Sequence, residues 1–226
     1  CDYDVSLTQE DQNPAIYAAR ERNDFTPGPV PAEFATVAEK LIMISLAHNN
    51  FNDTGLPAAL KGATKARSIY LQANAFNGPM NFDAMQWKDL RYLNLENNTF
   101  EGEFPSDSLT SLDAWQWLSV ANNKNLVGHV SDGLCKEIRG KTSGGSTFSD
   151  PTVGTLELLN IRGTGIACYA ECWQQAHDTD PYFSLLVDKR TQVCASNPQW
   201  EALQEIYGAF QLDDNKLFGS WNFDMD

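Results

Sequence analysis

The stretch Leu90–Pro105 reads LRYLNLENNTFEGEFP, and its spacing decides the fold. Leu93 and Leu95 alternate as in a short strand, where successive side chains point to opposite faces. Asn98 follows three residues later and suits a turn, because its amide can bond backbone groups that the bend leaves unpaired. Phe100 continues the apolar pattern at a spacing that is neither helical nor simply alternating. The stretch therefore predicts a short strand followed by a tight turn.

The same pattern recurs along the chain with an asparagine at the same phase. Measured between equivalent strand positions, the copies are 24 or 25 residues apart, and a final step spans 41 residues. A period of this length is typical of leucine-rich repeats, which stack one strand from each copy into a continuous parallel sheet. The equivalent strand positions are Ile44, Ile69, Leu93, Leu118 and Leu159.

The central copy resembles the plant-type subclass of leucine-rich repeats. It ends in Gly102-x-Phe104-Pro105, which matches the Gly-x-hydrophobic-Pro ending of that subclass. The repeated asparagines are expected to form a ladder that bonds the backbone in the turn after each strand. The predicted ladder consists of Asn49, Asn74, Asn98 and Asn123.

We predict an α/β fold: a leucine-rich-repeat solenoid of about six repeats, with a parallel concave sheet and a helical, disulfide-containing cap. The predicted divisions are 1–22 for a first strand and partial N-terminal cap, 23–166 for the array, and 167–226 for a helical C-terminal flank. The long step holds 16 extra residues and coincides with the Gly-, Ser- and Thr-rich segment 139–151. We expect a solvated loop there, although some plant receptor ectodomains use such insertions to form a ligand site.

Composition indicates a secreted protein. The net charge of −14 over 226 residues argues against nucleic acid, which binds proteins through Lys and Arg. Solubility explains the charge best, with a cationic partner or divalent ions as the alternative. No apolar run reaches the roughly 20 residues of a membrane-spanning helix. Five cysteines and two glycosylation sequons, at Asn52 and Asn97, favour an extracellular location.

The cysteines allow more than one pairing. Cys135 follows a strand and Cys168 follows the next repeat, so stacking predicts that these two pair. Cys172 with Cys194 is the second expected pair, which leaves Cys1 over. A zinc site is less favoured, because there is no second close pair of cysteines and the three histidines are dispersed.

The C-terminal flank has helical spacing in two places. Ala167–Ala176 is expected to be helical and to present Cys168 and Cys172 on one face. A second helix is expected after Asn197-Pro198, where Asn caps and Pro occupies the first helical position. The apolar stripe of this helix is Trp200, Leu203, Ile206, Tyr207 and Phe210.

The end of the chain resembles the cap that normally precedes a plant-type repeat array. In that family a helix of this kind is followed by a Ser-Trp-Asn element, which matches Trp221 and its neighbours here. A Cys-x-Trp-x-Gly-Val segment comes next, and Cys1-Asp-Tyr3-Asp-Val5 is similar to it, with Tyr for Trp and Asp for Gly. The second cysteine usual in that cap is missing. The resemblance implies that two halves of one cap stand at opposite ends of this chain.

Three explanations of the divided cap remain open. The chain could be one unit of a tandem array of such domains. It could be a protomer whose C-terminal helix caps the next protomer, and such a contact does not close and propagates as a fibre. It could also have an ordinary C-terminal cap that resembles an N-terminal one by chance. An unpaired Cys1 fits a bond to an adjoining unit.

The solvent-facing strand positions are expected to line up in rows across the concave sheet. These rows bring the aromatic residues Tyr70, Tyr92 and Trp117 together on a small, polar face, with Asn94 and Arg162 beside them. Aromatic residues are enriched at binding hot spots, so we predict a binding site from these five residues. The alternative is that the aromatic residues only pack against one another as cross-strand neighbours.

The sequence contains no nucleophile motif, phosphate loop or metalloprotease helix, so we predict no catalysis, cofactor or metal. We predict a non-catalytic extracellular module for protein–protein association, one unit of a tandem or head-to-tail filament. The alternative is a recognition domain similar to a receptor ectodomain or a cell-wall-enzyme inhibitor. The expected partners are copies of itself, neighbouring repeat domains, or a cell-wall or surface ligand, with no nucleic acid and no membrane span.

Overall fold

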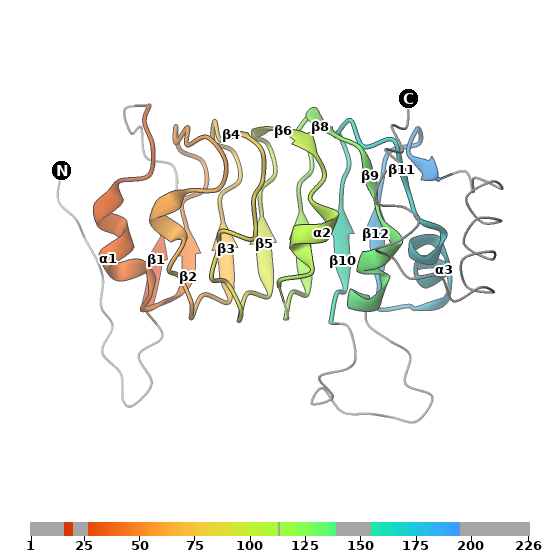
Figure 1. The fold of residues 1–226 in the computed structure, drawn as a ribbon, viewed down its shortest axis with the longest axis horizontal. Coiled ribbons are helices and arrows are strands. Elements are labelled where there is room, and N and C mark those ends of the chain that lie inside the picture. Colours follow the sequence, from red (N-terminus) through yellow and green to blue (C-terminus); the bar gives the residue numbers. More distant parts are fainter. Residues whose placement is uncertain (1–15, 20–26, 113, 139–154, 195–226) are drawn as a thin grey trace, which may run out of the picture. The chain divides into compact units, whose positions relative to one another are not determined.

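The structure is a computed structural model that describes residues 16–19, 27–112, 114–138 and 155–194. The chain divides into two compact units, Cys1–Val193 and Cys194–Asp226, and all of the second unit except Cys194 lies outside the described residues. In the first unit, short parallel strands follow one another along a solenoid (Figure 1). No helix in the described part is long and apolar enough to cross a membrane.

The main sheet has seven strands in the described part of the chain, all parallel, in the order β1-β2-β3-β5-β7-β10-β12. This arrangement confirms the predicted α/β leucine-rich-repeat fold and its parallel sheet. The strands are β1 (Ile16–Ala19), β2 (Leu41–Ser45), β3 (Ser68–Tyr70), β5 (Tyr92–Asn94), β7 (Trp117–Ser119), β10 (Leu158–Asn160) and β12 (Ser184–Leu186).

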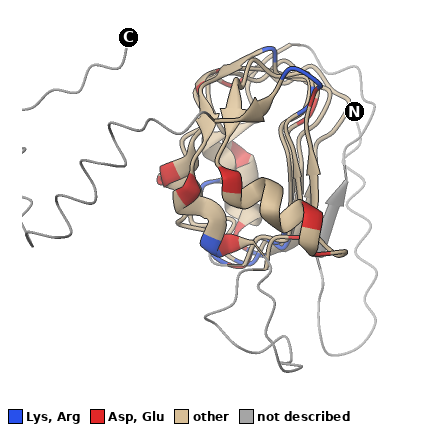
Figure 2. Cartoon of the chain, turned by 90° about the vertical axis from the view of Figure 1, so that its right-hand side faces the viewer, with Lys and Arg blue, Asp and Glu red and all other residues tan. Residues whose placement is uncertain are grey.

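The opposite side of the solenoid carries shorter elements. Viewed along its length, the main sheet lies on one side and the short helices lie on the other (Figure 2). The remaining strands are β4 (Asn77–Gly78), β6 (Thr99–Glu103), β8 (Asn125–Val127), β9 (His129–Val130), β11 (Cys168–Tyr169) and β13 (Gln192–Val193). The helices are α1 (Ala35–Ala38), α2 (Ser106–Leu109), α3 (Glu171–Thr179) and the 3₁₀ helices η1 (Ala32–Phe34), η2 (Ala58–Leu60) and η3 (Asp132–Glu137).

The core is a stack of equivalent side chains from successive repeats. The register aligns the inward strand positions, and all of them are buried: Ile44, Ile69, Leu93, Leu118 and Leu159. Behind the turns, the rings of Phe51, Phe76 and Phe100 stack with centroids 6.4 and 6.2 Å apart. Each repeat buries its apolar side chains only against its neighbours, so stacking rather than any single repeat supplies the stability.

The asparagines form the expected ladder. Asn98 Nδ2 donates to the carbonyl of Leu95 in its own repeat (3.1 Å) and to that of Leu71 in the preceding one (3.0 Å). Its Oδ1 accepts the Phe76 N–H at 3.2 Å. Asn74 and Asn123 make the same three kinds of bond. Each of these three asparagines therefore bonds backbone groups of two repeats at once, and Asn49 bonds the carbonyls of Leu46 and Ala47 in its own repeat.

The residue before each ladder position lies in the left-handed backbone region. The φ angles are 56° at His48 and Ala73, 53° at Asn97 and 61° at Asn122. Gly163 occupies the equivalent position in the next repeat, with φ 69°. Glycine and asparagine adopt this conformation readily, whereas alanine pays roughly 1 kcal/mol for it. The hydrogen bonds of the ladder thus hold the turn even where the residue itself, such as Ala73, disfavours a positive φ.

The sheet continues beyond the predicted end of the array at Ile166. Strand β12 pairs with β10, and Leu185 aligns with Leu159 in the buried row. The main sheet therefore takes one strand from the predicted 167–226 flank. The signal was weak because Tyr182 and Arg190 stand where the central copy has Leu90 and Asn98.

The predicted pairing of Cys135 with Cys168 is wrong. Cys135 is bonded to Cys172, with Cα atoms 6.2 Å apart, which also rules out Cys172 with Cys194. Cys168 and Cys194 are disulfide-bonded as well. Cys168 lies in strand β11 rather than on the expected helix, whereas Cys172 lies in α3, which packs on η3. Helix α3 packs on η3, so Cys172 in α3, rather than Cys168 in β11, lies beside Cys135 in η3.

Replacing Asn98 by Ala should lower the free energy of unfolding by about 3 kcal/mol, because the substitution removes three hydrogen bonds of the buried turn and takes away the acceptor of the Phe76 N–H. Urea unfolding followed by tryptophan fluorescence measures the change. The matched control is Asn125→Ala in β8, where the side chain is exposed and the change should stay within about 0.5 kcal/mol. Equal stability of Asn98→Ala and wild type would contradict the ladder's role.

Candidate functional site

The open face of the main sheet, the face directed away from the core, carries side chains in regular rows. One row runs Met43, Ser68, Tyr92, Trp117, Leu158 and Ser184. The next runs Ser45, Tyr70, Asn94, Ser119, Asn160 and Leu186. Rigid backbone hydrogen bonding holds both rows, so the side chains form a fixed surface.

The aromatic residues predicted as a binding site lie on neighbouring strands of this face. Tyr92 on β5 is in register with Trp117 on β7, and Tyr70 on β3 is in register with Asn94 on β5. Tyr92 is 39% exposed, and Tyr70 and Trp117 are partly buried. Partial burial fixes the rings while leaving surface for a partner, which is the usual setting of an aromatic anchor.

A carboxylate network lies beside these rings, and the sequence did not single it out. Glu96 Oε1 accepts hydrogen bonds from the Ser119 hydroxyl and from Asn160 Nδ2, the latter at 3.1 Å. Ser119 is fully buried beneath its neighbours, although its strand position faces outward. Glu96 makes no ion pair within the described residues. The available signal was the position of Glu96 two residues after Asn94, which places both side chains on the same side of the sheet.

A third row lies two residues beyond the second one and consists of Gln72, Glu96, Ala121 and Arg162. Gln72 precedes Glu96 in this row, and its Oε1 is buried without a hydrogen-bond partner in the described part of the chain. Arg162 follows β10 with an exposed side chain, and its N–H donates to Asn160 Oδ1 at 3.3 Å. The open face thus combines aromatic rings with hydrogen-bond acceptors. Among the described residues, no group of three His, Cys, Asp or Glu side chains is placed to hold a metal ion.

Both predicted glycosylation sites are exposed. Asn52 donates its N–H to Gly28 O at 3.0 Å, and the next residue, Asp53, accepts the Val30 N–H at 2.7 Å. Burial raises the pKa of the Asp53 carboxyl, and the bond from Val30 acts in the opposite direction. Asn97 lies in the turn after β5. Attachment of a glycan to Asn52 or Asn97 stays a prediction.

The remaining predicted site residues lie outside the described residues. They belong to the divided cap, together with the loop 139–151, and they stay predictions. The cap residues are Cys1, Tyr3, Trp200, Leu203, Ile206, Phe210 and Trp221.

Comparison with known proteins finds similar folds among plant proteins. The Arabidopsis receptor kinase HAESA, solved with the peptide hormone IDA and the co-receptor SERK1, has a TM-score of 0.56 at 19% identity, over 78% of this chain and 26% of that chain. The plant peptide hormone receptor RGFR1, solved with RGF2, has a TM-score of 0.52 at 19% identity, over 71% and 22%. A plant ice-binding protein has a TM-score of 0.51 at 19% identity, over 74% and 46%.

No family model and no curated protein matches the sequence. The matched region covers less than half of each of the three similar structures. At 19% identity the likeness concerns the fold, and it agrees with the repeat signature, the parallel sheet and the asparagine ladder. The chain has the fold of the plant-type extracellular leucine-rich-repeat proteins.

Proposed function

We propose that this chain is a non-catalytic extracellular module that binds another protein through the open face of its main sheet. The observation that carries this proposal is the row alignment of Tyr92 and Trp117 on the central strands β5 and β7. Both rings are held by a rigid sheet and remain partly accessible. Pre-ordered aromatic side chains bind with little loss of conformational entropy, which favours affinity.

The surroundings of the rings support a protein partner. Asn94 and Glu96 are partly exposed beside the rings and carry acceptor oxygens to which backbone or side-chain donors of a partner can bind. Two similar folds, HAESA and RGFR1, were solved with the peptide hormones IDA and RGF2. The disulfides support an extracellular location, because they persist in oxidising compartments.

Peptides selected from a random phage-displayed library against the full chain serve as probes of this site. The double variant Tyr92→Ala/Trp117→Ala should weaken the selected peptides by at least about 30-fold, corresponding to about 2 kcal/mol for loss of a hot spot. Biolayer interferometry measures the affinities, and urea unfolding checks that the variant is folded. Partial exposure of both rings predicts that the fold survives.

The matched control is Tyr182→Ala, which removes an aromatic ring that is 69% exposed and lies outside the rows. This variant should bind the selected peptides as the wild type does. Peptides that bind the Tyr92→Ala/Trp117→Ala variant at unchanged affinity would exclude the open face as the recognition surface.

Association between copies of the chain is a second candidate function. It is supported by the sequence alone, through the cap-like segments at Cys1–Val5 and 200–222. In this arrangement the apolar stripe of one copy covers the first repeat of the next, in a head-to-tail filament. The same segments also fit a tandem array of domains within one polypeptide.

Light scattering coupled to size-exclusion chromatography tests this association. Assembly predicts masses that rise with concentration in steps of 25.1 kDa. The variant Leu203→Asp/Ile206→Asp should restore a 25.1 kDa species, because charge on the apolar stripe blocks burial at the contact. A wild-type chain that stays at 25.1 kDa at every concentration would rule out self-assembly.

A further inference from the structure

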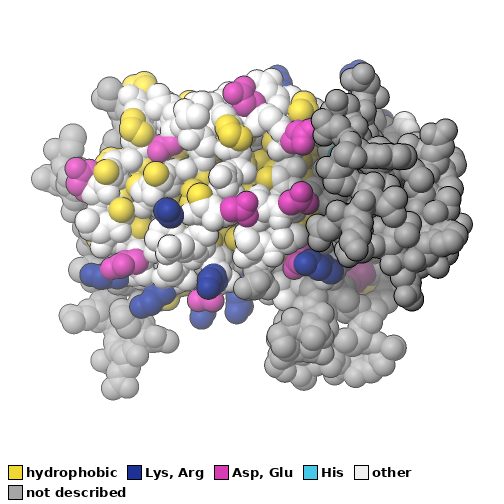
Figure 3. All heavy atoms as spheres, viewed as in Figure 1, with side chains coloured by type: hydrophobic (Ala, Val, Ile, Leu, Met, Phe, Trp, Pro, Cys, Tyr) yellow, Lys and Arg dark blue, Asp and Glu magenta, His cyan; other side chains and the backbone are white. Residues whose placement is uncertain are grey.

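A group of basic side chains lies where the chain enters strands β2, β3 and β5. Figure 3 shows dark blue side chains gathered along the lower edge of the molecule, below these strands in Figure 1. This clustering of positive side chains is unusual for a chain with a net charge of −14. We call the following six exposed residues the basic edge: Lys40, Lys61, Lys65, Arg67, Lys88 and Arg91.

The backbone fixes the spacing of the basic edge. The N–H of Arg67 donates to Ile42 O at 2.7 Å, and the N–H of Arg91 donates to Arg67 O at 2.9 Å. At the other end of these loops, Gln86 N–H donates to Lys61 O at 3.0 Å. The backbones of Arg67 and Arg91 therefore lie one strand separation apart, roughly 4.8 Å.

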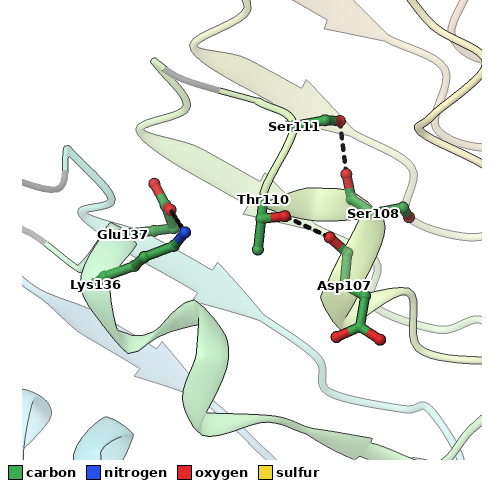
Figure 4. Close-up of polar contacts among 6 residues, drawn as sticks. All are labelled: Asp107, Ser108, Thr110, Ser111, Lys136 and Glu137. Carbon is green, nitrogen blue, oxygen red and sulfur yellow. Dashed lines mark hydrogen bonds and ion pairs between the residues drawn. The ribbon is translucent and has the colours of Figure 1, made fainter. Parts of the chain in front are cut away.

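The charges of the basic edge are not neutralised within the described part of the chain. None of its six side chains forms an ion pair or a hydrogen bond with a described residue. The one ion pair found among the described residues joins Lys136 and Glu137 at 3.7 Å, as Figure 4 shows. Two acidic residues, Glu39 and Asp89, share these segments, so positive charge is in excess.

Like charges lie side by side at the basic edge. Arg67 and Arg91 occupy equivalent positions on adjacent repeats, and like charges at neighbouring strand positions repel. An anionic partner would remove that repulsion and gain attraction to several fixed cations at once. The edge runs across the strands, along the solenoid, which matches a linear chain that carries negative groups at regular intervals.

We propose that the basic edge binds an anionic polysaccharide, through the carboxylate or sulfate groups of successive sugars. Lys and Arg recognise such groups as point charges and by bidentate hydrogen bonding, respectively. The disulfides place the chain in an oxidising compartment, where polyanionic sugars rather than nucleic acids are the accessible polymers. The proposal is independent of the open face, because the basic edge precedes the strands and the aromatic rows lie on them.

Surface plasmon resonance of the full chain over immobilised polygalacturonate, heparin and neutral dextran tests the proposal. The wild type should bind one or both anionic polymers at low ionic strength, lose binding as salt is added, and ignore dextran. Preference for polygalacturonate assigns carboxylate recognition, and preference for heparin assigns sulfate recognition. Absence of binding to both anionic polymers would overturn the proposal.

The variant Lys65→Gln/Arg67→Gln/Arg91→Gln should bind about tenfold more weakly, since each exposed charge contributes a fraction of a kcal/mol. The matched control, Lys124→Gln/Lys189→Gln/Arg190→Gln, removes three exposed cations elsewhere and should bind as the wild type does. Urea midpoints establish that both variants are folded. Equal losses in the two variants would show a response to net charge alone and would overturn the assignment to this edge.

Vesicles containing phosphatidylserine provide the remaining arm of the experiment. The basic edge should prefer the sugar polymers over these vesicles at equal ionic strength. Binding to vesicles together with failure to bind either polymer would identify a lipid surface instead and would overturn the polysaccharide proposal. Tyr92→Ala/Trp117→Ala should bind the polymers normally, which separates this site from the open face.

Discussion

The asparagine ladder is the interaction on which the rest of the structure depends. A tight turn after each strand buries carbonyls that no strand partner can reach, and unpaired buried carbonyls are costly. One amide per repeat serves its own turn and the turn before it, as Asn98 does for Leu95 and Leu71. The same bonds set the spacing between repeats, so the register of the sheet and the stacking of Phe51, Phe76 and Phe100 follow from them.

The ladder also explains how a small domain presents a flat functional surface. Because the turns are fixed from inside, the strand positions facing outward are free to vary without loss of register. Tyr92, Trp117 and Glu96 occupy such positions on the open face. The edge that precedes the strands is equally free, and in the repeats around β3 and β5 it carries Arg67 and Arg91. Two surfaces with different chemistry thus share one rigid support.

The fold was predictable because stacking demands the same residue types at the same phase in every repeat, as Ile44, Ile69 and Leu93 show. Strand β12 escaped prediction because its copy has Arg190 in place of the asparagine. The hydrogen bond from Asn160 to Glu96 crosses strand β7 and joins residues 64 positions apart, so no local sequence pattern predicts it. The cysteine pairing failed for a related reason: sequence order did not reveal which cysteine lies in the helical layer.

The disulfide between Cys135 and Cys172 joins two neighbouring repeats at the point where the asparagine ladder ends. Thr164 replaces the asparagine in the repeat of β10, and its hydroxyl donates only to Ile161 of its own repeat. The disulfide links two neighbouring repeats covalently where no asparagine side chain of the ladder bonds to the preceding repeat. Reduction of this bond is therefore expected to loosen the repeats of β10 and β12 before those of β2 to β7, which the ladder joins.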